Sequence, residues 1–292
     1  GLALETQFLA YLYHTNQHEL AVWIRDNVKF PSCMVDRITP RTTEALREDV
    51  EKRFPGYGYN AVQTEEYRQW VIEDNFASDF PDLTQVGVVI TKDIEPYEET
   101  KIRILNGGHT SLAYLGALSG YDTFDEVMND PTHRRHFKQL QYGEIIPSIE
   151  GDIPFDIFEY VDKVEERFSN ATNVDELDRI CMDGFTKFHT FVVPSLRKCL
   201  EQGKKPINIY KGIAAWYIYS RRFARGCTKI RYNEPNWTLL EPLLRDGAAD
   251  AFVSNERLWG DIPKQFISFT RDLKTILLSQ TYEHEIDLLG DD

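Results

Sequence analysis

Residues 98–116 read EETKIRILNGGHTSLAYLG, and the rest of the chain is best interpreted outward from this stretch. It opens with two acids and a threonine, as is typical of the first turn of a helix. At about 100° per residue, Lys101, Asn106 and His109 fall within about 140° of one another on one helix face. Each of the two glycines after Asn106 lowers the stability of a helix by about 1 kcal/mol when it lies in the helix interior. Glycines are useful there if a ligand or another backbone approaches closely.

A lysine, an amide and an imidazole on one face with apolar neighbours suit the oxidation of an alcohol without a metal. Lys101 would act as the general base, provided that desolvation and nearby cations lower its pKa. Asn106 and His109 would donate hydrogen bonds to the developing alkoxide. The spacing alone fits equally an exposed lysine, a capping asparagine and a core histidine, and it leaves both interpretations open.

On the C-terminal side of this stretch, the apolar spacing predicts helices throughout. The first helical region runs from 99 to 141, with a break at 119–121 and Thr123 as the N-cap of the part that follows. The other predicted helices cover residues 155–168, 173–202, 207–223, 236–249 and 263–279.

Before residue 90 the pattern is mixed. It predicts helices at 2–26 and 42–53, and short strands at 33–40, 70–74 and 86–90. We therefore expect a mainly α protein. An all-α, multi-helical domain at 94–292 would follow a mixed α/β segment at 1–93.

The composition is that of a globular protein and argues against several classes of function. The 292 residues carry a net charge of −14, which is unfavourable for binding nucleic acid or an anionic membrane. No apolar run reaches the roughly 18 residues of a transmembrane helix, and the first residues lack the basic region of a signal peptide. The four cysteines are far apart and predict free thiols rather than a zinc ribbon. We expect a cytoplasmic, metal-independent monomer that acts on a small molecule.

Four motifs, in order along the chain, resemble those of the polyol-specific long-chain dehydrogenases, the family of mannitol 2-dehydrogenase and of the fructuronate and tagaturonate reductases. The Lys-x4-Asn-x2-His pattern that ends at His109 is one of them. The others read FPSCMVDRITP at 30–40, WVIEDNF at 70–76 and RICMDGFTK at 179–187. The resemblance covers nearly the whole chain, and four ordered motifs are far more specific than the Lys–Asn–His triplet alone.

The resemblance implies a role for each matching position. Lys101 corresponds to the general acid/base that takes the proton of the substrate hydroxyl. Asn106 and His109 correspond to the groups that bind the reacting oxygen. Arg179 and Lys187 correspond to cations that reach the distal hydroxyls or the carboxylate of the substrate, although on their own they read as solvated helix charges.

Two further sites follow from the same resemblance and from spacing. Val35 and Asp36 correspond to residues that line the cleft beside the nicotinamide of NAD or NADP; alone they read as a strand end. Glu98 lies one turn before Lys101 and would relay protons to solvent, although acids at a helix start are common for capping reasons.

Some parts of the family pattern are not found in this sequence. Members carry a Rossmann domain with a glycine-rich loop, and no GxGxxG occurs here. The family's Cys-Asp-Asn motif, whose asparagine joins the site, is also missing. We therefore expect residues 1–93 to be the C-terminal part of a dinucleotide-binding domain, and the chain to be inactive by itself. Three functions stay open: a polyol–ketose oxidoreductase, a hexuronate reductase of the same family, and a non-catalytic helical binding module.

Overall fold

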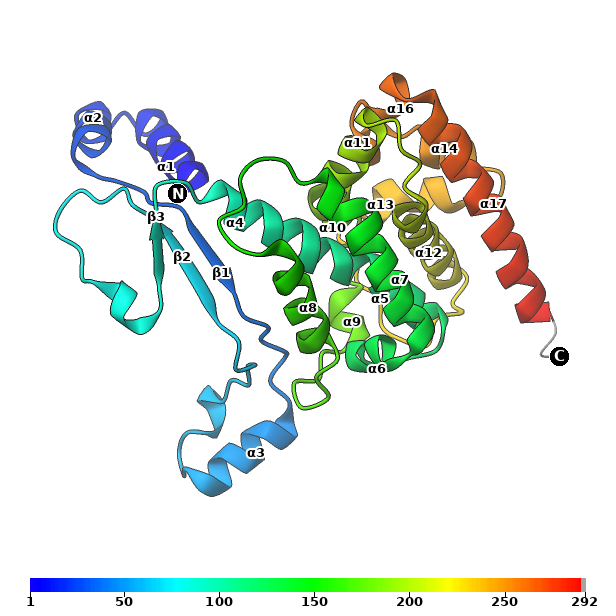
Figure 1. Ribbon diagram of the computed structural model, residues 1–292, viewed down its shortest axis with the longest axis horizontal. Helices are drawn as coiled ribbons and strands as arrows, with labels where there is room; N and C mark the ends of the chain where they lie inside the picture. The colour runs from blue at the N-terminus through cyan, green and yellow to red at the C-terminus, as the bar shows by residue number, and fades with distance from the viewer. Residues whose placement is uncertain (290–292) are drawn as a thin grey trace. The chain divides into compact units, whose positions relative to one another are not determined.

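A computed structural model describes residues 1–289, and the side chains of residues 1–280, in two compact units. The α/β unit comprises residues 1–99 and 152–154. The helical unit comprises residues 100–151 and the chain from 155 onward. Figure 1 shows the strands in the first unit and the many helices of the second. The prediction of a mostly helical protein with a small sheet is confirmed.

The α/β unit is built on a three-stranded sheet in the order β1 (Cys33–Asp36), β2 (Gln69–Glu73) and β3 (Val89–Thr91). β1 pairs antiparallel with β2, which places Met34 opposite Val71. β2 pairs parallel with β3. Met34 and Val71 form a small core with Ile94, whose burial holds the sheet together.

The helices of this unit are α1 (Leu2–His14), α2 (His18–Asn27) and α3 (Glu44–Arg53), and short 3-10 turns lie at Gly58–Asn60 and Leu83–Val86. The prediction of one helix over 2–26 is wrong, because Asn16 adopts a left-handed conformation with φ 59° between α1 and α2. The predicted helix at 42–53 is confirmed, and the Thr43 side chain accepts a hydrogen bond from the amide of Leu46 as its N-cap. The strand predicted at 86–90 starts only at Val89, after Gly87 turns the chain with φ 89°.

The helical unit consists of many short helices and two long ones, α12 and α17. Its elements, beginning with the helix that contains the boundary, are α4 (Glu95–Thr100), η3 (Lys101–Gly107), α5 (Gly108–Leu118), α6 (Phe124–Asn129), α7 (Pro131–Leu140), η4 (Gln141–Ile145), η5 (Ile146–Ser148), α8 (Ile157–Phe168), α9 (Leu177–Ile180), α10 (Gly184–Lys187), η6 (Phe188–Val192), α11 (Val193–Glu201), α12 (Ile207–Ala224), α13 (Trp237–Leu240), η7 (Glu241–Leu244), α14 (Ala249–Val253), α15 (Glu256–Trp259), α16 (Ile262–Gln265) and α17 (Ile267–Leu289).

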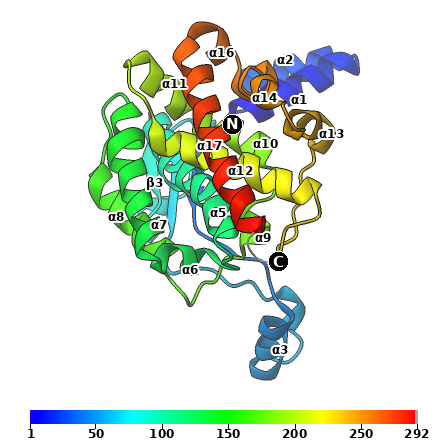
Figure 2. The same cartoon turned by 90° about the vertical axis from the view of Figure 1, so that its right-hand side faces the viewer.

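α12 is the centre of this unit, with α5 and α17 packed against it (Figure 2). Its residues 212–220 are all buried, including Trp216 and Tyr219. Such a helix, apolar on nearly every side, is stable only inside a protein. Gly212 packs directly over Ser111 of α5, because a Cβ there would lie 3.0 Å from the Ser111 side chain. The helix that carries the candidate site is thus fixed to the core.

The region predicted as one helix over 173–202 is broken into several elements, so that prediction is wrong. Residues 173–176 are not helical, and the extended residue Glu176 forms an antiparallel bridge with Thr123. Asp183 adopts a left-handed conformation with φ 54°, which separates α9 from α10. The neighbouring Gly184 is required by packing, since a Cβ there would lie 2.4 Å from the indole nitrogen of Trp216. The predicted helices at 236–249 and 263–279 are likewise interrupted.

Candidate active site

The segment that carries Lys101, Asn106 and His109 is helical throughout, but it is not a regular α-helix. The seven residues Lys101–Gly107 form a π-helix, η3, that continues into α5. In a π-helix the backbone amide of a residue bonds to the carbonyl five positions before it. Residues five apart, such as Lys101 and Asn106, are therefore closer to alignment than the α-helical spacing indicates.

The glycine pair after Asn106 is explained by close packing. A Cβ on Gly107 would lie 2.9 Å from the backbone oxygen of Phe191 in η6. A Cβ on Gly108 would lie 2.5 Å from the amide nitrogen of Gln141 in η4. That nitrogen donates a 2.9 Å hydrogen bond to the carbonyl of Ile104 inside the π-helix. The glycines are needed because another backbone and a buried amide approach η3, one of the two reasons that the sequence suggested.

His109 lies at the start of α5 in a largely apolar pocket. Its ring stacks on Phe168 at 4.8 Å between centroids and meets the edge of Phe124 at 4.2 Å. Burial lowers the pKa of His109 to about 3, against a smaller opposing effect of Asp175. The imidazole is therefore neutral near pH 7 and keeps one N–H donor and one acceptor nitrogen.

Asp175 links His109 to the two predicted cations. Its carboxylate lies 3.9 Å from His109 Nε2, too far for a hydrogen bond. It accepts hydrogen bonds from Arg179, one from Nε at 2.6 Å and a second from Nη2. These contacts raise the pKa of Arg179. Asp175 itself is buried, with 7% of its side chain exposed.

Lys187 completes the cluster. Its Nζ donates to the carbonyl of Ile180 at 2.8 Å, and burial lowers its pKa. Arg179 and Lys187 both act electrostatically on His109, each lowering its pKa further. The structure thus brings together His109, Arg179 and Lys187, which lie far apart in the sequence.

Asn106 presents a buried acceptor to the interior of the unit. Its side-chain oxygen has no hydrogen-bond partner among residues 1–280, whose side chains the structure describes. A buried amide oxygen without a partner costs free energy, so it calls for a donor that the protein does not provide. Lys101 is half-buried on the same π-helix.

Sequence reasoning missed Asp175. The 173–202 stretch was expected to be helical, which would leave Asp175 on a solvated first turn. In the structure its backbone carbonyl accepts from the amide of Phe124 at 2.9 Å, so it belongs to an extended segment paired with residue 123. The available signal was the i, i+4 spacing to Arg179, which predicts an ion pair.

The predicted cofactor residues belong to the α/β unit. Val35 and Asp36 end β1, and their side chains alternate as in any strand: Val35 is 59% exposed and Asp36 is 1% exposed. Glu98 lies in α4 and is half-buried.

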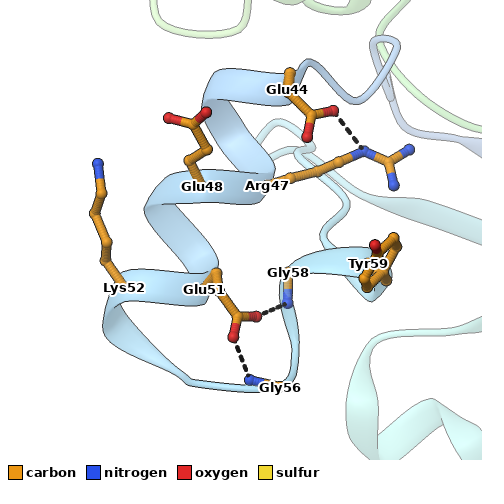
Figure 3. A pocket seen from close by; sticks show the side chains of 8 residues that line it. All are labelled: Glu44, Arg47, Glu48, Glu51, Lys52, Gly56, Gly58 and Tyr59. Atoms are coloured by element: carbon orange, nitrogen blue, oxygen red, sulfur yellow. Dashed lines mark hydrogen bonds and ion pairs between the residues drawn. The ribbon is translucent and has the colours of Figure 1, made fainter.

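A pocket of about 420 Å³ lies elsewhere in the α/β unit, on α3 and the 3-10 turn after it (Figure 3). Glu51 accepts hydrogen bonds from the amides of Gly56 and Gly58 at its floor, and the exposed Tyr59 borders it. None of the site residues predicted from the sequence lines this pocket.

Three general features bear on the earlier expectations. All four cysteines are free, as predicted. No cluster of three or more His, Cys, Asp or Glu side chains that could hold a metal occurs in the part of the chain that the structure describes. Within that same part, no helix is long and apolar enough to cross a membrane.

Taken together, the structure describes a helical unit that carries the candidate site residues and a small α/β unit. Residues 93–277 match the family model of the mannitol dehydrogenase C-terminal domain, and residues 4–85 match that of the mannitol dehydrogenase Rossmann domain. The chain therefore belongs to the mannitol dehydrogenase family, as the sequence motifs indicated.

Individual relatives agree with this assignment. A mannitol dehydrogenase of Saccharomyces cerevisiae is 39% identical over 75% of this chain and 44% of its own length. The mannitol 2-dehydrogenase of Cereibacter sphaeroides is 38% identical over 81% of this chain and 49% of its own length. The chain thus spans about half the length of the curated relatives that it matches.

A solved structure matches the whole chain. The Pseudomonas fluorescens mannitol 2-dehydrogenase, in a ternary complex with NAD and D-mannitol, superposes with a TM-score of 0.83 at 29% identity. The match covers 100% of this chain and 60% of that one. A D-sorbitol dehydrogenase in substrate-free form matches 94% of this chain and 56% of its own, with a TM-score of 0.79 at 31% identity.

Proposed function

We propose that this chain is part of an NAD- or NADP-dependent oxidoreductase that interconverts an acyclic polyol and its ketose without a metal. The observation that carries the proposal is the neutral His109, with 14% of its side chain exposed, beside Arg179 and Lys187. It lies in the first turn of α5, directly after the π-helix that holds Lys101 and Asn106. The relative from Pseudomonas fluorescens, solved with NAD and D-mannitol, supports the same cofactor and substrate class.

Lys101 would be the general base. A secondary alcohol becomes a ketone when its carbon gives up a hydride and its oxygen gives up a proton. The neutral amine of Lys101 would take that proton, and in the reverse direction its ammonium would return it. NAD or NADP, when bound, supplies the acceptor for the hydride.

Asn106 and His109 would hold the oxygen that loses the proton. The amide of Asn106 can donate from its nitrogen, and its unpartnered oxygen can accept from a neighbouring substrate hydroxyl. A neutral His109 donates one N–H, which stabilises a developing alkoxide without first transferring a proton to it. Arg179 and Lys187 would bind hydroxyls further along the substrate.

The α/β unit would contribute to binding the cofactor. Ligands of open α/β sheets bind at the carboxyl ends of strands, and Val35 and Asp36 are the last residues of β1. The exposed apolar side chain of Val35 is chemically suited to the face of a nicotinamide ring. Glu98 would pass protons between Lys101 and solvent. We place the division between a cofactor domain and a substrate domain near residue 93.

The substitution Lys101→Ala in the full-length enzyme tests the proposal. We expect kcat for mannitol or a related polyol to fall by about 10²–10⁴-fold, because a general base contributes that much. Cofactor binding, measured by NADH fluorescence, should change little. Lys163→Ala is the matched control, since Lys163 is an exposed lysine of the helical unit whose Nζ pairs with Glu166.

A Lys101→Ala enzyme of nearly unchanged rate would exclude Lys101 as the base. A wild-type enzyme that oxidises none of mannitol, arabinitol and sorbitol, and reduces none of their ketoses, would exclude the polyol assignment itself.

A further inference from the structure

We propose that Asp175 is a specificity-determining residue: it occupies the Arg179 fork and thereby selects an uncharged polyol over a sugar acid. The inference rests on the proposed function and deepens it. It concerns the charge at the end of the substrate distant from Lys101. A hexonate, the reduced form of a keto-hexuronate, differs from the corresponding polyol there in a single group, a carboxylate in place of a hydroxymethyl.

The first step of the argument is that the Arg179–Asp175 pair is built into the fold. Asp175 is held by the backbone bridge of its own segment, through the amide of Phe124 on one side and the pairing of Glu176 on the other. Arg179 donates to both carboxylate oxygens, from Nε and from Nη2. This is the bidentate geometry in which an arginine normally recognises the carboxylate of a ligand.

The second step is electrostatic. With Asp175 in the fork, the pair carries no net charge, and it presents a fixed negative group 3.9 Å from His109 Nε2. A substrate carboxylate placed near His109 would gain little from Arg179 and would be repelled by Asp175. Asp178 also acts electrostatically on Arg179, and Asp183 acts on Lys187, so each cation of the cluster has acidic neighbours.

The third step is that the pair can still bind hydroxyl groups. A guanidinium has five N–H donors, and Asp175 accepts from two of its nitrogens, Nε and Nη2. The remaining donors can bind neutral hydroxyl oxygens without the full charge of the arginine. Arg179 is 35% exposed, so these donors are accessible.

D-Mannitol and D-mannonate, fully hydrolysed from its lactone, are matched probes because they differ only at C1. The measured quantity is the ratio of the inhibition constant of mannonate, competing with mannitol, to the KM of mannitol in the full-length enzyme. In the wild type we expect this ratio to exceed one. In Asp175→Asn we expect it to fall by about tenfold or more, because the positive charge of Arg179 is no longer neutralised by a neighbouring carboxylate.

Two further variants keep the test decisive if Asp175→Asn does not fold. Arg179→Gln leaves Asp175 without its cation, and the ratio should rise above that of the wild type. The double variant Asp175→Asn/Arg179→Gln removes both charges, and its ratio should return toward the wild-type value. Thermal melting identifies the folded variants.

The outcomes separate this inference from the proposed function. An enzyme that oxidises mannitol but shows the same ratio in all variants overturns the role of Asp175 and leaves the polyol assignment standing. A wild type that binds mannonate more tightly than mannitol overturns the inference and favours a hexuronate reductase. Absence of any polyol activity overturns the proposed function first.

Discussion

His109 shows how the environment of a single residue determines its chemistry. Two phenylalanine rings exclude water from the imidazole, and Arg179 and Lys187 oppose a further positive charge. Both effects favour the neutral imidazole, and together they outweigh the opposing effect of the Asp175 carboxylate on the pKa of His109. If Lys101 is the base, as proposed above, a neutral histidine with a low pKa does not compete with it for the substrate proton.

This environment makes the stability of the protein depend on pH. The pKa of His109 is about 3 in the folded state and about 6.5 unfolded. Between these values only the unfolded chain binds the proton, so stability falls as pH decreases, by up to about 1.4 kcal/mol per pH unit from this group. His109→Phe, which suits the aromatic pocket, should lack that contribution. Urea unfolding at pH 7.5, 5.5 and 4.5 measures the difference between the two proteins, and a difference that stays constant with pH would contradict the neutral assignment.

A second histidine illustrates why contacts alone do not define a catalytic site. His133 is half-buried, and its ring nitrogens lie 3.0 Å from Asp130 and 3.2 Å from Ser119 Oγ. The order Ser–His–Asp resembles a hydrolase triad. However, Ser119 is the C-cap of α5 and donates to the carbonyl of Leu115. The C-terminus of a helix presents carbonyl oxygens, which would destabilise an oxyanion. The contacts of His133 with Ser119 and Asp130 therefore stabilise the packing of α7 against the end of α5.

At the scale of elements, the π-helix is the feature that the sequence did not indicate. The pattern of apolar residues in 98–116 predicts a helix, and it does not distinguish four-residue from five-residue hydrogen bonding. The type of helix depends on distant groups: Gln141 bonds to the carbonyl of Ile104, and the Phe191 backbone packs on Gly107. Such contacts exist only after the chain has folded.

Gly107 provides a test of this packing. In an ordinary helix, alanine in place of glycine gains about 0.5–1 kcal/mol. At Gly107 the new Cβ would lie 2.9 Å from a backbone oxygen, so we expect Gly107→Ala to destabilise the protein by about 1–3 kcal/mol. Gly143→Ala is the control, because Gly143 is also in a π-helix, η4, and nothing lies within 4 Å of its Cβ position. Chemical denaturation measures the free energy of unfolding of both variants. Equal changes would show that the close contact of Gly107 with η6 does not account for the loss of stability.

Element boundaries could be predicted where a local signal exists. Thr123 was expected to cap the helix after the break at 119–121, and it forms a capping box with Glu126. The long helix over 173–202 was wrong because its apolar spacing continues across Asp183, where the backbone turns. The same error hid Asp175. Five candidate site residues of the helical unit were chosen by motif. The carboxylate of Asp175, which acts on three of them, becomes visible only through tertiary pairing.

At the scale of the whole molecule, the sequence predicted a change of character near residue 93. In the structure, the chain divides into an α/β unit and a helical unit, and the first passes into the second between residues 99 and 100. Each unit has buried residues of its own: Met34 belongs to the small core of the sheet, and Leu112 is fully buried in the helical unit. Units with separate cores are expected to behave as domains.

We therefore expect thermal unfolding to show two transitions, one for each core. Met34→Ala and Leu112→Ala each remove a buried side chain, which costs about 2–5 kcal/mol where the cavity does not close. The first should lower only the transition of the α/β unit, and the second only that of the helical unit. Leu278→Ala, at a position 54% exposed, should leave both unchanged. Differential scanning calorimetry of the three variants tests this expectation. If the protein unfolds in a single cooperative transition, Met34→Ala and Leu112→Ala will lower the same melting temperature, because domains that unfold together share one free energy of unfolding.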